Sequence, residues 1–134
     1  MRAAAALAAA GWVAFSAPGA GAAPPEEAYR LHCSGCHGPD GAGSAGVAPS
    51  LRELAGLLAA PGGRAYLVRV PGVAQAPLAS AELARLLNWV LRELSGAGDL
   101  APYTAGEVEA WRRDPLRDPL AARPAPAQAD LRAR

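Results

Sequence analysis

Several residue types that usually build a small protein core are scarce in this chain. Its 134 residues include one Phe, three Trp, three Tyr, one Met and two Cys. With so few large side chains, a core made of protein alone would be small, although a composition of 51% hydrophobic residues excludes a fully disordered chain. We therefore expect one domain in which something other than amino-acid side chains fills part of the core.

The chain also lacks an excess of either charge, because 13 basic residues, all of them arginine, nearly balance 12 acidic residues. No basic run is interleaved with aromatic residues, which argues against a nucleic-acid-binding surface. Long apolar runs are missing as well. The apolar stretch at residues 3–15 is shorter than the roughly 20 residues that a membrane-spanning helix needs.

The first 22 residues have the form of an export signal. Arg2 precedes the apolar stretch, and Ala20-Gly21-Ala22 has the A-x-A pattern of a signal peptidase site. We expect residues 1–22 to be a cleaved signal peptide and the mature chain to be periplasmic, with no membrane span after cleavage. Cleavage would also remove Met1, which is the chain's single methionine.

Proline and glycine divide the chain into short segments whose apolar patterns are helical. Residues 24–27 read P-P-E-E, which is typical of a helix start, and we expect that helix to run to about Cys36. Ser50 is a predicted cap for a helix over residues 51–58, where leucines line one face. Residues 64–70 predict a short helix or an extended connector, because no partner strand is visible.

The strongest helical pattern lies at residues 81–94. Apolar residues recur there at the i, i+3, i+4, i+7 spacing of an amphipathic helix. Thr104 and Glu107 have the spacing of a capping box and predict a last helix to about Arg113. Residues 114–134 are rich in proline and predict an extended or loosely docked tail. The predicted fold class is all-α.

Both cysteines and both histidines lie within six consecutive residues, 32–37. A disulfide is the simplest use of two cysteines in an exported protein, but it gives no reason for His37 to follow Cys36 directly. A thioredoxin-like dithiol requires alternating strands and helices, which the patterns do not indicate. Zinc requires about four ligands in a tetrahedron, and one helical turn cannot surround an ion.

The C-x-x-C-H pattern of residues 33–37 accounts for all of these residue types if it attaches heme c. Two thiols, from Cys33 and Cys36, add to the vinyl groups of one heme, and the imidazole of His37 becomes an axial iron ligand. The large apolar ring would fill the core that the side chains leave small. His32 points about 100° away from the next side chain on a helix, so we expect it to be partly exposed and not a ligand.

With this motif the sequence resembles the class I c-type cytochromes, which are small helical electron carriers. The resemblance covers roughly residues 25–95 and rests on several positions besides the motif. They are Tyr29 on the first helix, Gly41 and Gly43 in the D-G-x-G loop, Pro49 and Leu51 in P-x-L, and Trp89 on the last family helix. The resemblance implies a cytochrome c-like domain at residues 23–100 wrapped around one covalently bound heme, followed by a C-terminal extension at residues 101–134.

The resemblance also implies roles for individual residues. The Pro49 carbonyl is expected to accept the Nδ1 proton of His37, which fixes the tautomer and makes the ring a better iron ligand. Polar groups expected to hydrogen-bond the heme propionates are Arg64 and Tyr66 first, with Trp89 and two further arginines behind them, since the arginine fork suits a carboxylate. The two further arginines are Arg52 and Arg69.

The sequence departs from the family at the sixth iron ligand. Members usually supply a methionine from the loop before the last helix, here residues 70–80, and this loop contains neither Met nor His. Water or an empty position is our first expectation for the distal side, followed by Gln75, and then by Tyr66 or a residue of a partner protein. Losing the methionine sulfur is expected to lower the potential and to open the iron to CO, NO or peroxide.

Three functions follow from these observations. The first is a periplasmic mono-heme cytochrome c, not an enzyme, that performs electron transfer between redox partner proteins such as a dehydrogenase, an oxidase or another cytochrome. The second is a heme protein with an open distal site that binds a small molecule and has weak peroxidase activity. The third is a cytochrome subunit of a larger oxidoreductase complex, docked through residues 103–113 and the proline-rich tail.

Overall fold

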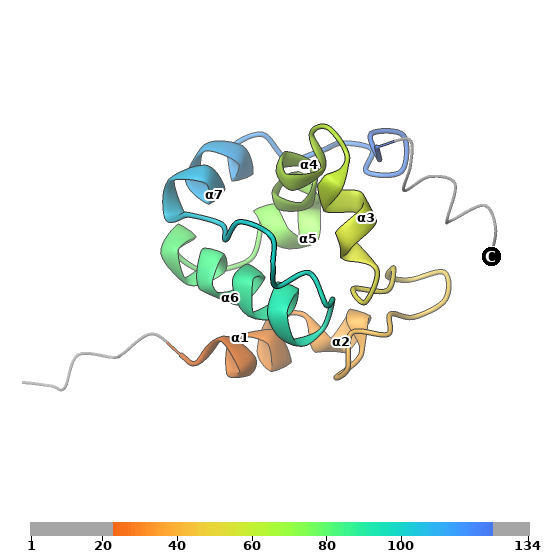
Figure 1. Ribbon diagram of the computed structural model, residues 1–134, viewed down its shortest axis with the longest axis vertical. Helices are drawn as coiled ribbons and strands as arrows, with labels where there is room; N and C mark the ends of the chain where they lie inside the picture. Colours follow the sequence, from red (N-terminus) through yellow and green to blue (C-terminus); the bar gives the residue numbers. More distant parts are fainter. Residues whose placement is uncertain (1–22, 125–134) are drawn as a thin grey trace, which may run out of the picture.

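The computed structural model describes residues 23–124, and the chain in this range is helical (Figure 1). The predicted signal peptide at residues 1–22 and the last ten residues of the predicted tail lie outside the described residues. The helices are α1 (Pro25–His32), α2 (Ser34–His37), α3 (Leu54–Ala59), α4 (Gly63–Arg69), α5 (Pro71–Ala74), α6 (Ser80–Glu93) and α7 (Ala105–Arg112). The only pairing of strand type in this range is an isolated bridge between Ser44 and Ala48, so the all-α fold class is confirmed.

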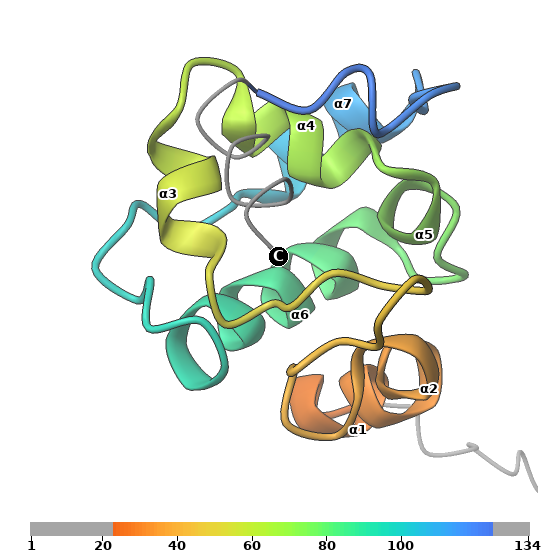
Figure 2. The same cartoon turned by 90° about the vertical axis from the view of Figure 1, so that its right-hand side faces the viewer.

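Helix α6 lies in the middle of the structure, as its regular apolar pattern leads one to expect. Figures 1 and 2 show α1 and α2 on one side of α6, with α4, α5 and α7 on the other. Six of its side chains are buried, Leu83, Ala84, Leu86, Leu87, Val90 and Leu91. The helix begins at Ser80, where the Glu82 carboxylate accepts a hydrogen bond of 3.1 Å from the Ala79 amide. The predicted helix at residues 81–94 is therefore confirmed to within one residue at each end.

The predicted helix from residue 24 to about Cys36 is present, but it is interrupted at Cys33, the first residue of the C-x-x-C-H motif. Cys33 separates α1 from α2 with φ −126° and ψ −38°, and its amide still donates to the Tyr29 carbonyl. The Cys33 carbonyl then accepts from the amides of both Cys36 and His37, which begins a new turn. The two cysteines therefore lie on one short turn that is set at an angle to α1.

Helix α3 begins later than the sequence predicts. The Ser50 hydroxyl accepts a hydrogen bond from the Arg52 amide, and this local turn takes the place of a helix cap. The helix starts at Leu54, and its apolar face is buried as expected at Leu54, Leu57 and Leu58. Residues 64–70, for which a connector was the alternative, form helix α4 up to Arg69, with Tyr66, Leu67 and Val68 buried.

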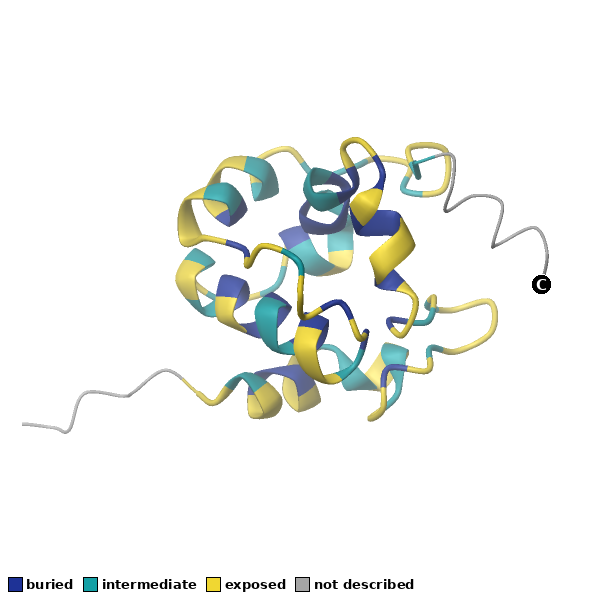
Figure 3. Cartoon of the chain, viewed as in Figure 1, coloured by how far each residue is buried: buried dark blue, intermediate teal, exposed yellow. Residues whose placement is uncertain are grey.

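The region after residue 100 packs on the same core as the rest of the chain. Tyr103 is 3% exposed and Val108 is fully buried, and both belong to the hydrophobic cluster that includes α1, α4 and α6. The Asn88 side chain fastens the connection by donating to the Tyr103 carbonyl at 3.0 Å and accepting from its amide at 2.7 Å. Helix α7 therefore turns its apolar side inward, as its exposed outer positions in Figure 3 also indicate.

The predicted loose tail is attached over its first part. The Leu116 amide donates to the Arg69 carbonyl at 2.8 Å, and the Tyr66 hydroxyl donates to the Pro119 carbonyl at 2.9 Å. Residues 114–119 form no helix or strand, and these two hydrogen bonds dock them on α4, which is compatible with the expected extended or loosely docked tail.

The predicted capping box at the start of α7 is confirmed, and it makes stability depend on pH. The Glu107 amide donates to the Thr104 hydroxyl, and the Glu107 carboxylate accepts from the Thr104 amide at 2.9 Å. This backbone hydrogen bond is the main cause that lowers the pKa of Glu107, with further help from the Thr104 hydroxyl and Arg64. A lowered pKa in the folded state gives stability above the unfolded-state pKa, and that stability is lost as the pH falls through the folded-state pKa.

We expect Glu107→Gln to lower the free energy of unfolding at pH 7 by about 1 kcal/mol, because glutamine keeps the shape but not the charge. As the pH falls below the ordinary glutamate pKa of 4.5 and then through the lowered pKa of Glu107, the difference from the wild type should shrink, since the wild-type carboxylate becomes protonated. Urea unfolding at a series of pH values measures this. A constant difference across the acid range would contradict the assignment.

Within residues 23–124, no helix combines the length and the apolar character that a membrane crossing requires.

Candidate heme-attachment site

The site is built on the turn formed by residues 33–37, which includes α2 and is called the attachment turn below, and on the glycine-rich loop that follows it. The hydroxyl of Tyr29, which is buried on α1, donates to the Gly38 carbonyl at 2.6 Å, at the point where α2 ends. The Tyr29 ring lies 5.4 Å from the Trp89 ring of α6, centroid to centroid, in a tilted arrangement. The crossing of α1 and α6 therefore fixes the position of the attachment turn through a single aromatic side chain.

Burial raises the pKa of the Tyr29 hydroxyl, with smaller contributions from Cys33 and Asp40. The hydroxyl therefore stays protonated at neutral pH and remains a donor to Gly38. Trp89 is half-buried, and its ring packs against Tyr29 at an interplanar angle of 41°. Its predicted contact with a heme propionate stays a prediction.

Cys33 and Cys36 are both free thiols on this turn. Cys33 is partly buried and Cys36 is exposed. Burial, and then the neighbouring Cys36, raises the pKa of the Cys33 thiol. A raised pKa is the opposite of the shift that activates the cysteine of a dithiol oxidoreductase, whose C-x-x-C thiolate is stabilised.

The loop after α2 returns to the attachment turn and is bound to it by two hydrogen bonds. The Gly43 amide donates to the His37 carbonyl at 2.8 Å, and the Ser44 hydroxyl donates to the Cys36 carbonyl at 2.9 Å. The loop is closed on itself where the Leu51 amide donates to the Gly41 carbonyl at 2.8 Å. These contacts bring Pro49 next to His37, although twelve positions separate the two in the sequence.

The close return of the loop requires glycine at position 43. Its φ is +81°, and a Cβ added there would lie 2.7 Å from the Ala48 oxygen, the Pro49 carbonyl carbon and the Ser50 nitrogen. No side chain fits such a distance, and the left-handed conformation is itself unfavourable for other residues. Gly43 therefore lets the backbone of residues 48–50 pass against the attachment turn.

The His37 imidazole is oriented by the Pro49 carbonyl, with 3.0 Å between Nδ1 and the oxygen. A carbonyl oxygen only accepts hydrogen bonds, so Nδ1 must carry the proton of the neutral ring. Nε2 then presents a free lone pair, which is the state in which imidazole binds a metal. Two free thiols on one turn, an adjacent imidazole with its Nε2 lone pair available, and a backbone carbonyl holding the other nitrogen together fit covalent heme.

The side chains predicted to bind heme propionates have protein partners in this structure. Arg64 donates to the carbonyls of Ala101 and Pro102 and to the Glu107 carboxylate, and its guanidinium lies 4.2 Å from the Tyr103 ring centroid. Tyr66 donates to Pro119.

The two further arginines are engaged in the same way. Arg69 bonds both the backbone and the side chain of Asp114, and Arg52 does the same with Asp40. A propionate role for any of the four side chains therefore requires exchange or sharing of these donors, and it stays a prediction.

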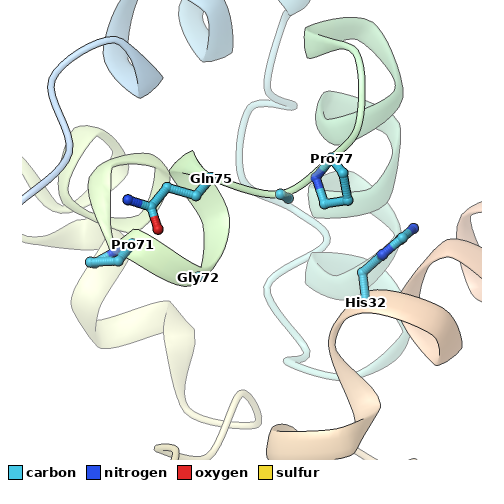
Figure 4. A pocket seen from close by; sticks show the side chains of 6 residues that line it. His32, Pro71, Gly72, Gln75 and Pro77 are labelled. Carbon is cyan, nitrogen blue, oxygen red and sulfur yellow. The ribbon is translucent and has the colours of Figure 1, made fainter.

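An open pocket of about 260 Å³ adjoins the attachment turn. Figure 4 shows His32, at the end of α1, facing Pro77, while Gln75 lies beside Pro71 on the opposite wall; Gly72 and Ala76 complete the lining. Gln75 and His32 are both exposed. No local pattern predicts that His32 and the loop at residues 70–80 line one pocket.

Contacts between residues 103–112 and the helices around the pocket were not predicted, yet α7 contacts α4, α5 and α6. Within residues 23–124, no group of three or more His, Cys, Asp or Glu side chains gathers as a metal site would require.

Comparison with protein-family models gives no match, and comparison with the curated proteins gives no relative either.

Proposed function

We propose that the chain binds one heme c covalently through Cys33 and Cys36, with His37 Nε2 as the proximal iron ligand. The observation that carries this proposal is the 3.0 Å hydrogen bond between His37 Nδ1 and the Pro49 carbonyl. It selects the tautomer that an iron ligand needs, and it involves the residue immediately after the C-x-x-C pair. Neither a disulfide nor a dithiol requires a neighbouring imidazole that is held in one orientation.

The proposed activity is the transfer of one electron between redox partner proteins in the periplasm. When bound, the heme supplies the Fe(II)/Fe(III) couple. The protein's part is to hold the imidazole at a fixed orientation and to keep the attachment turn in place through Tyr29 and Trp89. The exposed position of Cys36 leaves the neighbouring edge of the turn open to a partner protein.

A second candidate function, binding of a small molecule, is favoured by the residues available on the distal side. The chain's one methionine is Met1, and its two histidines are the proximal candidate His37 and His32, the last residue of α1. Gln75 is a polar side chain of the loop at residues 70–80, and it lies exposed at the pocket that His32 also lines.

Optical spectra of the purified periplasmic protein decide between these two functions. We expect a covalent heme whose ferrous spectrum changes when CO is added, because the chain supplies no sulfur ligand to compete with it. A low-spin spectrum that CO leaves unchanged would contradict an open distal side. Electron transfer would then remain as the proposed function. The lack of any Soret band would contradict both functions.

A further inference from the structure

Arg112, the last residue of α7, binds the loop between α5 and α6 through all three nitrogens of its guanidinium group. Nε donates to the Ala74 carbonyl at 3.1 Å, Nη2 to the Ala76 carbonyl at 2.7 Å and Nη1 to the Leu78 carbonyl at 2.7 Å. These acceptors belong to one five-residue segment, although 34 to 38 positions separate them from Arg112 in the sequence. One side chain thus fixes the path of a whole loop.

Besides the packing of Ala74, Ala76 and Leu78 against the core, few other contacts hold this segment. Its amides make only short local hydrogen bonds, from Ala74 to Val70, from Gln75 to Pro71, from Ala76 to Val73 and from Leu78 to Ala76. Pro77 has no amide hydrogen to contribute. Carbonyls beyond the end of a short helix lack helical partners, and the planar guanidinium fork offers donors in the right plane for several of them at once.

Arg112 is itself attached to a firmly packed element. Val108, one turn earlier on α7, is fully buried, and Trp111 lies with its ring edge-on to Tyr103 at 6.4 Å between centroids. The capping box of Thr104 and Glu107 fixes the other end of the helix. Because α7 is anchored at both ends, the core and not the loop sets the position of the helix that carries Arg112.

The loop that Arg112 holds is also one wall of the pocket beside the attachment turn. Gln75, Ala76 and Pro77 line that wall, and all three lie inside the segment at residues 74–78. His32, which directly precedes Cys33, also lines the pocket and lies next to Pro77 in Figure 4. The width of the opening therefore depends on where Arg112 holds the loop.

We propose that Arg112 is a positioning residue that sets the access of small neutral ligands to the heme. The C-terminal extension, through this side chain, keeps the loop at residues 74–78 in place and so limits the opening next to the attachment turn. This inference rests on the proposed heme site for its functional consequence. Its structural part, the fixing of the loop, depends only on the contacts of Arg112.

The test uses the full exported protein with Arg112→Gln, Arg112→Lys and the control Arg113→Gln. The neighbouring Arg113 is exposed and donates to the Glu109 carboxylate, so its replacement removes the same charge without touching the loop. The first measurement is hydrogen exchange at the amides of residues 75, 76 and 78. The second is the rate at which CO binds the ferrous protein.

We expect Arg112→Gln to speed exchange at these three amides by about tenfold or more, since a hydrogen bond from a charged donor is lost at each carbonyl. CO should bind faster by a similar factor. Arg112→Lys should give an intermediate result, because one ammonium group cannot span three carbonyls. Arg113→Gln should behave like the wild type in both measurements.

Unchanged exchange at residues 75–78 in both Arg112 variants would overturn the inference, and so would an equal change in Arg113→Gln. Normal heme content with an unaltered CO rate would overturn the ligand-access part while leaving the proposed function intact. A wild-type protein without covalent heme would overturn the proposed function, and the exchange result would still decide whether Arg112 holds the loop. If Arg112→Gln does not fold, hydrogen exchange and CO binding of Arg112→Lys decide between these outcomes.

Discussion

Replacing Cys33 and Cys36 together by serine is expected to abolish covalent heme attachment. A hydroxyl does not form the thioether that joins each sulfur to a vinyl group, so no bond would hold the ring when the protein is denatured. In acid acetone the wild-type pigment should stay with the protein, whereas any heme associated with the double variant should be extracted. The protein should also be less stable, since the ring is expected to fill part of a core that is poor in large side chains.

The matched control is Ser34→Ala, which changes the same turn without touching a proposed attachment point. The Ser34 hydroxyl donates to the Arg30 carbonyl at 2.8 Å on the exposed side of α1, so its loss should cost little. Full heme content is expected for this variant. If the serine double variant kept acid-stable heme, the attachment chemistry assigned to the two cysteines would be wrong.

Gly43→Ala is expected to be the most damaging single change of small size near the site. The added Cβ would lie 2.7 Å from the carbonyl carbon of Pro49, the group that orients His37. Relief of this contact must move the backbone of residues 48–50 away from the imidazole. We expect a loss of about 2 to 4 kcal/mol in the free energy of unfolding, from the left-handed backbone and the steric overlap together.

Gly46→Ala separates the cost of the left-handed backbone from the cost of the steric overlap. Gly46 has a similar φ of +72°, but an added Cβ would meet no atom within 4 Å. It should therefore show only the backbone cost, about 1 kcal/mol. Gly43→Ala should in addition alter the visible spectrum of the heme, because a displaced Pro49 carbonyl no longer fixes the His37 ring. Equal losses in the two variants, with unchanged spectra, would contradict the close packing of loop against turn.

Local patterns in the sequence were sufficient to predict the central helix and the capping box. Residues 83–91 carry a regular apolar face, and both Glu82 and Glu107 lie at the position where an acidic side chain reaches back to the start of its helix. These features depend on neighbours within one or two turns, which a sequence displays directly.

Features that depend on distant partners were not predictable in the same way. The break at Cys33 follows from the return of the loop to α2, and the later start of α3 follows from the Ser50 turn. The role of Arg112 arises from acceptors more than thirty positions away, all of them backbone carbonyls, which carry no signature in the sequence. Asn88 was one possible signal, because it is an amide side chain next to the apolar face of α6, and in the structure it bonds the backbone of Tyr103.

The site itself was predictable in part. The motif at residues 33–37 needs no long-range information, and the resemblance to class I cytochromes led us to expect the contact between His37 and Pro49 that the structure contains. The propionate donors were predicted from their expected place in the fold and from residue type. Arginine is equally suited to carbonyls and carboxylates, and Arg64 shows this by binding Ala101, Pro102 and Glu107.

The most direct measurement of the central claim is the mass of the exported protein and of its peptide containing residues 33–37. Addition of two thiols to two vinyl groups eliminates no atoms, so the mass should exceed that of the mature chain by one complete heme. The whole increase should map to this peptide and survive acid-acetone extraction. A mass lower than that of the reduced chain by two hydrogens would show a disulfide between Cys33 and Cys36 instead, and would contradict the account.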